Sequence, residues 1–167
     1  MDIREALLAE HSRLQTMKVV GYIDGDADRF AELVRLFLGD EYRVSQRAAA
    51  AVGYCVEHRH ELVRPYFGKF VAQLEHTDAH PAIRRNILRL LQFVEIPIGF
   101  RAKAYDACIG LIDDPNEPVA VRAFAMTVAA NIAREHPDLM RELRSIVNAH
   151  LGNTTIAFRV RARTILA

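Results

Sequence analysis

The amino-acid sequence predicts an all-α protein built from stacked helical hairpins. Four arginines recur along it at intervals of 38, 37 and 37 residues, each after a polar turn and at the start of an apolar run. Apolar residues around each arginine return at helical spacing. No segment alternates apolar and polar residues over six positions, and no Asn-Gly or Asp-Gly turn joins two β-branched runs. A repeat of this length is typical of two-helix units that stack on one another. The four arginines are Arg47, Arg85, Arg122 and Arg159.

The pattern of apolar residues predicts ten helices in chain order. They are expected at residues 2–10, 12–23, 27–38, 43–57, 60–75, 80–94, 98–112, 117–134, 137–150 and 154–166. The first helix of most pairs has one apolar stripe, as in Phe30, Leu33, Val34 and Phe37. Paired along the chain, the helices give hairpins at 1–24, 27–57, 60–94, 98–134 and 137–166, within one repeat domain covering residues 1–167.

The start of each second helix has its own signals. Six to eight residues before each arginine stands an acid or amide, the residue type that caps helix N-termini. These residues are Asp40 and Glu41, Asp78, Asp114 and Asn116, and Asn153. Pro81 and Pro118 stand four residues before two of the arginines, which suits the first turn of a helix. Each arginine therefore marks the first turns of a second helix.

One segment resembles a known repeat. The run from Asp113 to Ala125, with its Asp-Pro turn, Val121-Arg122 pair and Ala125, is similar to the HEAT-repeat consensus. The resemblance implies a right-handed α-solenoid of about four to five hairpins, with first helices on the convex side and second helices on the concave side. Gln46 and Arg84 depart from the pattern before the arginine, and Asn153 replaces the aspartate. HEAT repeats are a structural class, so the resemblance names no substrate.

Composition excludes several classes of function. The chain has 167 residues, of which 51% are hydrophobic and 26% charged, and its formal net charge is +1. One compact soluble unit is expected, without a global field that attracts nucleic acid or an acidic membrane. No run of eighteen apolar residues and no signal-peptide core occurs, so we expect a cytoplasmic protein.

The arginine column has two interpretations. Arginine fits phosphate oxygens, so four aligned arginines could follow a phosphate backbone. In HEAT-like units, however, this arginine typically bonds to an acid or amide of its own or a neighbouring turn, and we favour this structural role for Arg47, Arg85, Arg122 and Arg159. An anion-binding surface would then depend on the additional residues Arg84, Arg89, Arg161 and Arg163.

The second helices are apolar on more than one side. Ile87, Leu90 and Phe124 are expected to point away from the partner helix, so they either line an apolar groove or are buried by tight stacking. The chain ends in the apolar segment 164–167, which either packs on a second copy, giving a homodimer through the last helix, or is tolerated in solution.

The sequence contains no recognisable catalytic set. No GxSxG, HExxH, Walker or GxGxxG motif occurs, and the seven histidines lie in turns rather than on one helix face. Cys55 and Cys108 are interpreted as buried apolar residues. The chain has no Trp, whereas the HEAT-like alkylpurine DNA glycosylases hold damaged DNA with tryptophans. We therefore expect no enzyme activity, no metal and no cofactor.

The sequence thus predicts a non-enzymatic scaffold that binds a protein or peptide through its concave second-helix surface. The expected contact residues are Ile87, Leu90, Phe124, Arg84, Arg89, Arg161 and Arg163. The alternative is a nucleic-acid or phospholigand binder that uses the clusters Arg84, Arg85 and Arg89, and Arg159, Arg161 and Arg163. Salt separates the two, because phosphate-driven binding weakens steeply as the salt concentration rises.

Overall fold

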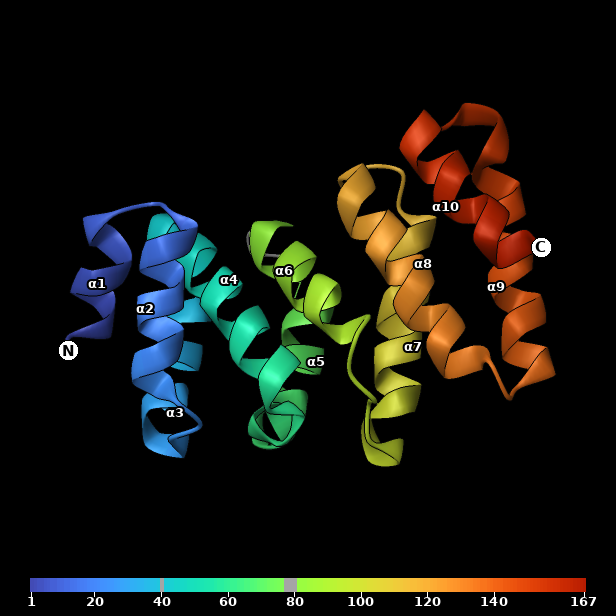
Figure 1. The fold of residues 1–167 in the computed structure, drawn as a ribbon. Coiled ribbons are helices and arrows are strands. Elements are labelled where there is room, and N and C mark those ends of the chain that lie inside the picture. Colours follow the sequence, from blue (N-terminus) through green and yellow to red (C-terminus); the bar gives the residue numbers. More distant parts are fainter. Residues whose placement is uncertain (40, 77–80) are drawn as a thin grey trace. The chain divides into compact units, whose positions relative to one another are not determined.

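The computed structural model describes residues 1–39, 41–76 and 81–167. Within these ranges the chain forms ten α-helices, two 3₁₀ helices and no strand, so the predicted all-α repeat fold is confirmed (Figure 1). The α-helices are α1 (Ile3–Ala9), α2 (Arg13–Ile23), α3 (Ala27–Phe37), α4 (Tyr42–His58), α5 (Phe67–Glu75), α6 (Pro81–Leu91), α7 (Ile98–Asp113), α8 (Val119–Ala133), α9 (Pro137–His150) and α10 (Ile156–Leu166). The 3₁₀ helices are η1 (His60–Tyr66) and η2 (Leu151–Asn153).

The predicted helix at 60–75 is divided in two. Its first half is the 3₁₀ helix η1, and α5 begins only at Phe67. Pro65 lies inside η1 and has no amide hydrogen, so it cannot join an α-helical ladder there. The predicted helix at 80–94 also ends early, at Leu91, where Phe93 N–H bonds back to the Leu90 carbonyl in a tighter turn.

Within the described residues, the side chains that cap helices are not the predicted ones. Asp2, Ser12 and Asp26 accept hydrogen bonds from the first free amides of α1, α2 and α3. The cap of α10 is Thr155 rather than the predicted Asn153. Asp114 accepts from the backbone and side-chain amides of Asn116, so it stabilises the turn before α8 instead of the helix end. Glu41 makes no side-chain cap bond, and Asp40 and Asp78 lie outside the described residues.

The described chain packs as two compact units, residues 1–66 and 67–167. In the first unit, α4 contacts α1, α2 and α3, so it forms the centre of the unit. Its core is apolar and fully buried, with Ile3, Ile23, Phe30, Leu33 and Phe37 among the largest side chains. Between α2 and α3 the backbone turns sharply through Asp24 and Gly25, which both have positive φ.

In the second unit the helices form two layers (Figure 1). α7 contacts both α5 and α9, which gives one layer, and α8 contacts both α6 and α10, which gives the other. α7 and α8 form the most extensive pair. Two long-range hydrogen bonds involve α9: Tyr105 Oη of α7 donates to the Leu139 carbonyl of α9 at 2.6 Å, and Arg144 Nε of α9 donates to the Ile165 carbonyl of α10 at 3.1 Å.

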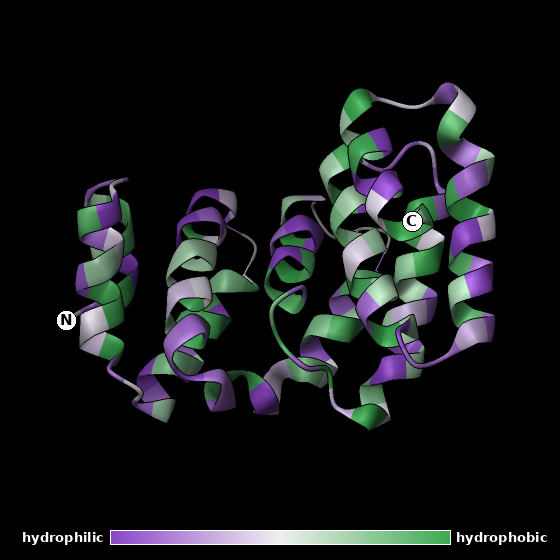
Figure 2. Ribbon diagram, turned by 45° about the vertical axis from the view of Figure 1, so that its right-hand side comes forward, coloured by the Kyte–Doolittle hydropathy of each residue, from purple (hydrophilic) through white to green (hydrophobic). Residues whose placement is uncertain are grey.

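The helices fall into two classes according to their place in each hairpin. The first helices are α1, α3, α5 with η1, α7 and α9, and the second helices are α2, α4, α6, α8 and α10. Hydrophilic and hydrophobic residues are interleaved along both classes (Figure 2). α8 is the most apolar second helix, and Val121, Ala125, Met126 and Val128 are all fully buried. None of the described helices has the length and apolar character needed to cross a membrane.

Candidate functional site

The apolar residues predicted to line a groove are mostly buried. Ile87 is completely buried and Leu90 is 8% exposed, so both predictions of surface contact residues are wrong. The physical reason is that α6 packs on α5 and on α8, and two neighbours require a wide apolar face. Phe124 on α8 is partly exposed and remains available to a partner.

Arg84 is also unavailable for surface contacts. Its guanidinium donates Nη1 to the His76 carbonyl at 2.9 Å, and Nη2 lies 2.7 Å from Glu117 Oε1. Both side chains of this ion pair are nearly buried, at 7% and 11% exposure. The prediction of Arg84 as a binding residue is therefore wrong, because its charge is already matched inside the protein.

The arginine column occupies four different environments. Arg47 donates to the carbonyls of Leu7 and Leu8 at the end of α1, and Arg122 donates twice to the Ile112 carbonyl. Arg85 is half-buried and Arg159 is exposed, and neither side chain bonds to another described residue. Where acceptors exist, they are main-chain carbonyls rather than the acids or amides that the sequence suggested.

In three of the hairpins, the fourth residue of the second helix makes the same kind of contact. The fourth residue of α4, α6 and α8 is Ser45, Arg84 and Arg122, and each donates to a carbonyl at or just past the end of the preceding first helix. The acceptors are Phe37, His76 and Ile112. Each bond runs from a second helix to the end of the first helix before it, so it holds the two helices of a hairpin together. The fourth residue of α10, Arg159, is exposed instead.

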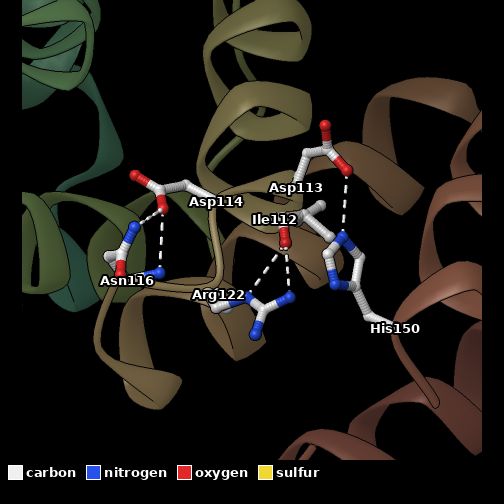
Figure 3. Close-up of polar contacts among 6 residues, drawn as sticks. All are labelled: Ile112, Asp113, Asp114, Asn116, Arg122 and His150. Atoms are coloured by element: carbon white, nitrogen blue, oxygen red, sulfur yellow. Dashed lines mark hydrogen bonds and ion pairs between the residues drawn. The ribbon is translucent and has the colours of Figure 1, made fainter. Parts of the chain in front are cut away.

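The turn between α7 and α8 shows how the second layer is positioned (Figure 3). Arg122 reaches back to the Ile112 carbonyl through Nε at 2.9 Å and Nη2 at 2.7 Å. Beside it, Nε2 of His150 lies 2.9 Å from Asp113 Oδ1, which ties the end of α9 to the end of α7. Burial lowers the pKa of Arg122, and the charges of Asp114 and Asp113 oppose that shift. The charged Arg122 side chain therefore makes its contacts inside the second unit.

Three predicted arginines do reach the surface. Arg89 on α6 and Arg163 on α10 are exposed, and Arg161 on α10 is half-buried. Arg161 Nη1 donates to Thr127 Oγ1 of α8 at 2.8 Å, which holds α10 against α8. Thus α8 and α10 are brought together with basic side chains around their junction.

The second helices are far more basic than the rest of the chain. They hold eleven Lys and Arg residues and a single acid, Glu57. The first helices hold nine basic and nine acidic residues, and the remaining eleven acids stand outside both classes of helix in the sequence. The formal net charge of +1 therefore conceals a basic class of helices. This signal was present in the sequence, but it appears only when charges are counted by element.

Exposed apolar side chains concentrate on the same helices. Eight large hydrophobic residues are exposed in the described chain, and five of them lie on second helices: Leu14, Met17, Tyr42, Ile156 and Val160. All but Tyr42 stand three or four positions from a basic residue on the same helix, which makes the two side chains neighbours on the helix surface. These basic residues are Arg13, Lys18, Arg159 and Arg163. The second helices therefore present mixed basic and apolar surfaces.

One cleft lies within the second unit. It has a volume of about 400 Å³ and lies between the α6–α7 connection and the end of α8. Arg101 spans its rim, bonding to the Ile96 carbonyl and to Glu95 at 2.8 and 2.9 Å. Arg134, also in the lining, donates to Asn131 Oδ1 at 3.2 Å. The cleft therefore holds one ion pair and no convergent set of reactive side chains.

The described residues contain no group of three His, Cys, Asp or Glu side chains placed to hold a metal ion. His58 and His76 lie in the described chain, whereas His80 lies outside it. Cys55 and Cys108 are buried and unbonded to one another. Burial raises the pKa of the Cys55 thiol to about 11 and that of Cys108 to about 12. Neither thiol is thus activated as a nucleophile.

The comparisons with known proteins fit this arrangement. The sequence matches the family described as the HEAT repeat domain over residues 3–167. No curated protein matches the sequence.

Proposed function

The chain belongs to the HEAT repeat family, and from this premise we propose that it is a cytoplasmic, non-enzymatic scaffold that binds a protein or peptide partner through its second helices. The observation that carries the proposal is the composition of those helices. They combine eleven basic residues, one acid and most of the exposed large apolar side chains of the described chain. Charged groups steer association and apolar groups supply contact area, so this mixture suits a protein surface.

The contact residues proposed from the sequence change accordingly. Phe124, Arg89, Arg161 and Arg163 remain, whereas Ile87, Leu90 and Arg84 are replaced by the exposed apolar residues. Rigid helices present these side chains without reactive chemistry, as a binding scaffold requires.

The proposal is tested by reversing charge on one class of helix at a time. Arg89→Glu/Arg163→Glu changes two exposed second-helix residues, and the matched control Arg35→Glu/Lys103→Glu changes two exposed first-helix residues. With each tagged variant as bait in extracts of the source cell, a direct partner should be retained by the wild type and the control but lost from the second-helix variant. Equal retention by both variants would contradict the proposal.

Nucleic-acid or phospholigand binding is the second candidate, favoured by the acid-free sequences of α6, α8 and α10. In the same retention experiment, nucleic-acid binding gives a different result from a protein partner. Retention that disappears after nuclease treatment, or that falls steeply between 50 and 200 mM salt as counterion release requires, would favour this candidate. Retention that survives both treatments favours the protein partner.

A further inference from the structure

α10 has two apolar faces, and the protein covers only one of them. Phe158, Ala162 and Ile165 are buried against the second unit. On another side of the same helix, Ile156 is 78% exposed and Val160 is 56% exposed. These two β-branched residues stand four positions apart, so their side chains are neighbours on the helix surface. A surface helix normally has one apolar stripe, and a second one marks a contact surface.

The exposed face of α10 is also strongly basic. Arg159 and Arg163 are exposed and lie three and seven positions after Ile156, so they share its side of the helix. α10 contains no acid, and its neighbour α8 contains none either. Within the described residues, neither Arg159 nor Arg163 forms an ion pair. Together Ile156, Arg159, Val160 and Arg163 form what we call the outer α10 face.

We propose that the outer α10 face docks an amphipathic helical segment of a partner protein, in which Asp or Glu residues flank an apolar stripe. This inference rests on the proposed function and identifies its partner by chemistry. An apolar pair at i and i+4 matches the side-chain spacing along a helix of the partner. Exposed arginines without partners beside that pair are complementary to carboxylates, which Arg can bind through two parallel hydrogen bonds.

The other occupants of such a face fit less well. A two-fold homodimer through α10 would place the same patch on both copies and bring arginines against arginines. A nucleic-acid backbone would meet Arg159 and Arg163 but offers nothing to Ile156 and Val160. An anionic membrane normally takes up a broad apolar face with aromatic residues, whereas this face has two aliphatic side chains. An amphipathic peptide helix with acidic residues contacts both the arginines and the aliphatic pair.

The position of α10 is fixed firmly enough for docking. The Phe158 ring lies under the Arg122 guanidinium, at 4.5 Å from the guanidinium carbon, and packs edge-on against the His150 ring at 6.4 Å. The bond from Arg161 to Thr127 adds a polar link to α8. A partner helix would therefore meet a pre-organised surface, which lowers the entropic cost of binding.

The experiment selects displayed 16-residue random peptides on the full chain and measures their dissociation constants by fluorescence anisotropy. The test variants are Arg159→Glu/Arg163→Glu and Ile156→Ser/Val160→Ser, and the matched control is Phe93→Ser/Ile98→Ser, which lies outside the second helices. A further variant, Leu14→Ser/Met17→Ser on α2, tests the rest of the second-helix surface. All eight positions are exposed, so circular dichroism and urea unfolding should show native folding in each variant. Selected peptides should carry acids around an apolar stripe at helical spacing. Each α10 variant should weaken binding by about tenfold or more, and the control by less than about twofold.

Several outcomes overturn the inference. These are selected peptides without acids, a selection that yields no peptide dependent on α10, and tighter binding of a 20-base-pair DNA duplex or anionic vesicles lost in the same variants. Sedimentation showing a wild-type dimer abolished by Ile156→Ser/Val160→Ser would also overturn it. If peptide binding instead requires α2 or Arg89, the inference fails and the proposed function stands. If peptide binding survives every second-helix variant, both fail.

Discussion

The guanidinium of Arg122 lies over the ring of Phe158, with its central carbon 4.5 Å from the ring centroid. The same guanidinium donates two hydrogen bonds to the Ile112 carbonyl at the end of α7. One side chain of α8 therefore joins the preceding first helix to the following second helix. This dual contact explains why a charged residue is buried in the most apolar second helix of the chain.

Replacement of Arg122 should destabilise the protein more than any other single arginine of the column. Arg122→Met removes both bonds to Ile112 and leaves that carbonyl buried without a partner, so we expect a loss of about 2 to 3 kcal/mol of unfolding free energy. Urea unfolding monitored by circular dichroism measures the change. Arg159→Met alters the corresponding, exposed residue of α10 and should change stability by less than about 0.5 kcal/mol. Equal losses would show that the bonds of Arg122 contribute nothing.

The positions of the helices followed from the sequence, because apolar spacing and turn residues act locally. The role of individual arginines did not. Arg84 and Arg85 are adjacent, and an alignment on arginine alone favours Arg85, whereas the carbonyl of His76 is reached by Arg84. Ser45 makes the same kind of hydrogen bond through its hydroxyl. The shared feature is therefore a donor at the fourth position of the second helix rather than an arginine.

The surface was harder to predict than the fold for a related reason. Apolar spacing shows which side of a helix avoids water, but it does not distinguish burial by a partner helix from burial by the next hairpin. The sequence left open whether Ile87 and Leu90 line a groove or are buried by stacking, and in the structure neighbouring helices cover them. Ile156 and Val160, which are exposed, share their helix with the buried Phe158 and were indistinguishable from it by residue type. Only the packing of α10 on α8 separates the two sets.

Ser45 provides a second test of the fourth-position contact. Ser45→Ala removes the hydroxyl that donates to the Phe37 carbonyl within a buried environment, and we expect a loss of about 1 to 2 kcal/mol. Ser145→Ala, on the exposed side of α9, is the matched control and should be nearly neutral. Thermal or urea unfolding of the two variants gives the comparison. A neutral Ser45→Ala would mean that water replaces the hydroxyl at this position.

The Arg84–Glu117 pair should behave as a unit in a double-mutant cycle. Glu117→Leu leaves the Arg84 charge buried without its carboxylate, so we expect a loss of about 3 kcal/mol or more. Arg84→Met/Glu117→Leu should recover most of that loss, because buried pairs are often replaceable by apolar residues of similar volume. The same variants should leave partner binding unchanged, because Arg84 is not part of the proposed contact surface. Additive losses in the cycle would contradict a coupled pair.

Alkaline pH should destabilise the protein through its two buried thiols. Burial raises the pKa of Cys55 to about 11 and that of Cys108 to about 12, above the value of about 8.5 expected in the unfolded chain. The folded state therefore holds these protons more tightly. Their contribution to stability is complete below about pH 8.5 and is lost as the pH rises towards 11 to 12. Near pH 9.5 the loss should reach about 1 kcal/mol per thiol, measured by urea unfolding across the pH range.

The variant Cys55→Ala/Cys108→Ala isolates this effect from other groups that titrate at high pH. Tyr105, whose pKa burial also raises, is present in both proteins and cancels in the comparison. The variant should lose some stability at pH 7 from lost packing, but its unfolding free energy should fall less steeply between pH 8.5 and 11. Native thiols should likewise react with an alkylating reagent far more slowly than thiols in urea, since only the exposed thiolate reacts. Equal pH slopes together with fast native alkylation would mean that both cysteines open to solvent in the folded protein.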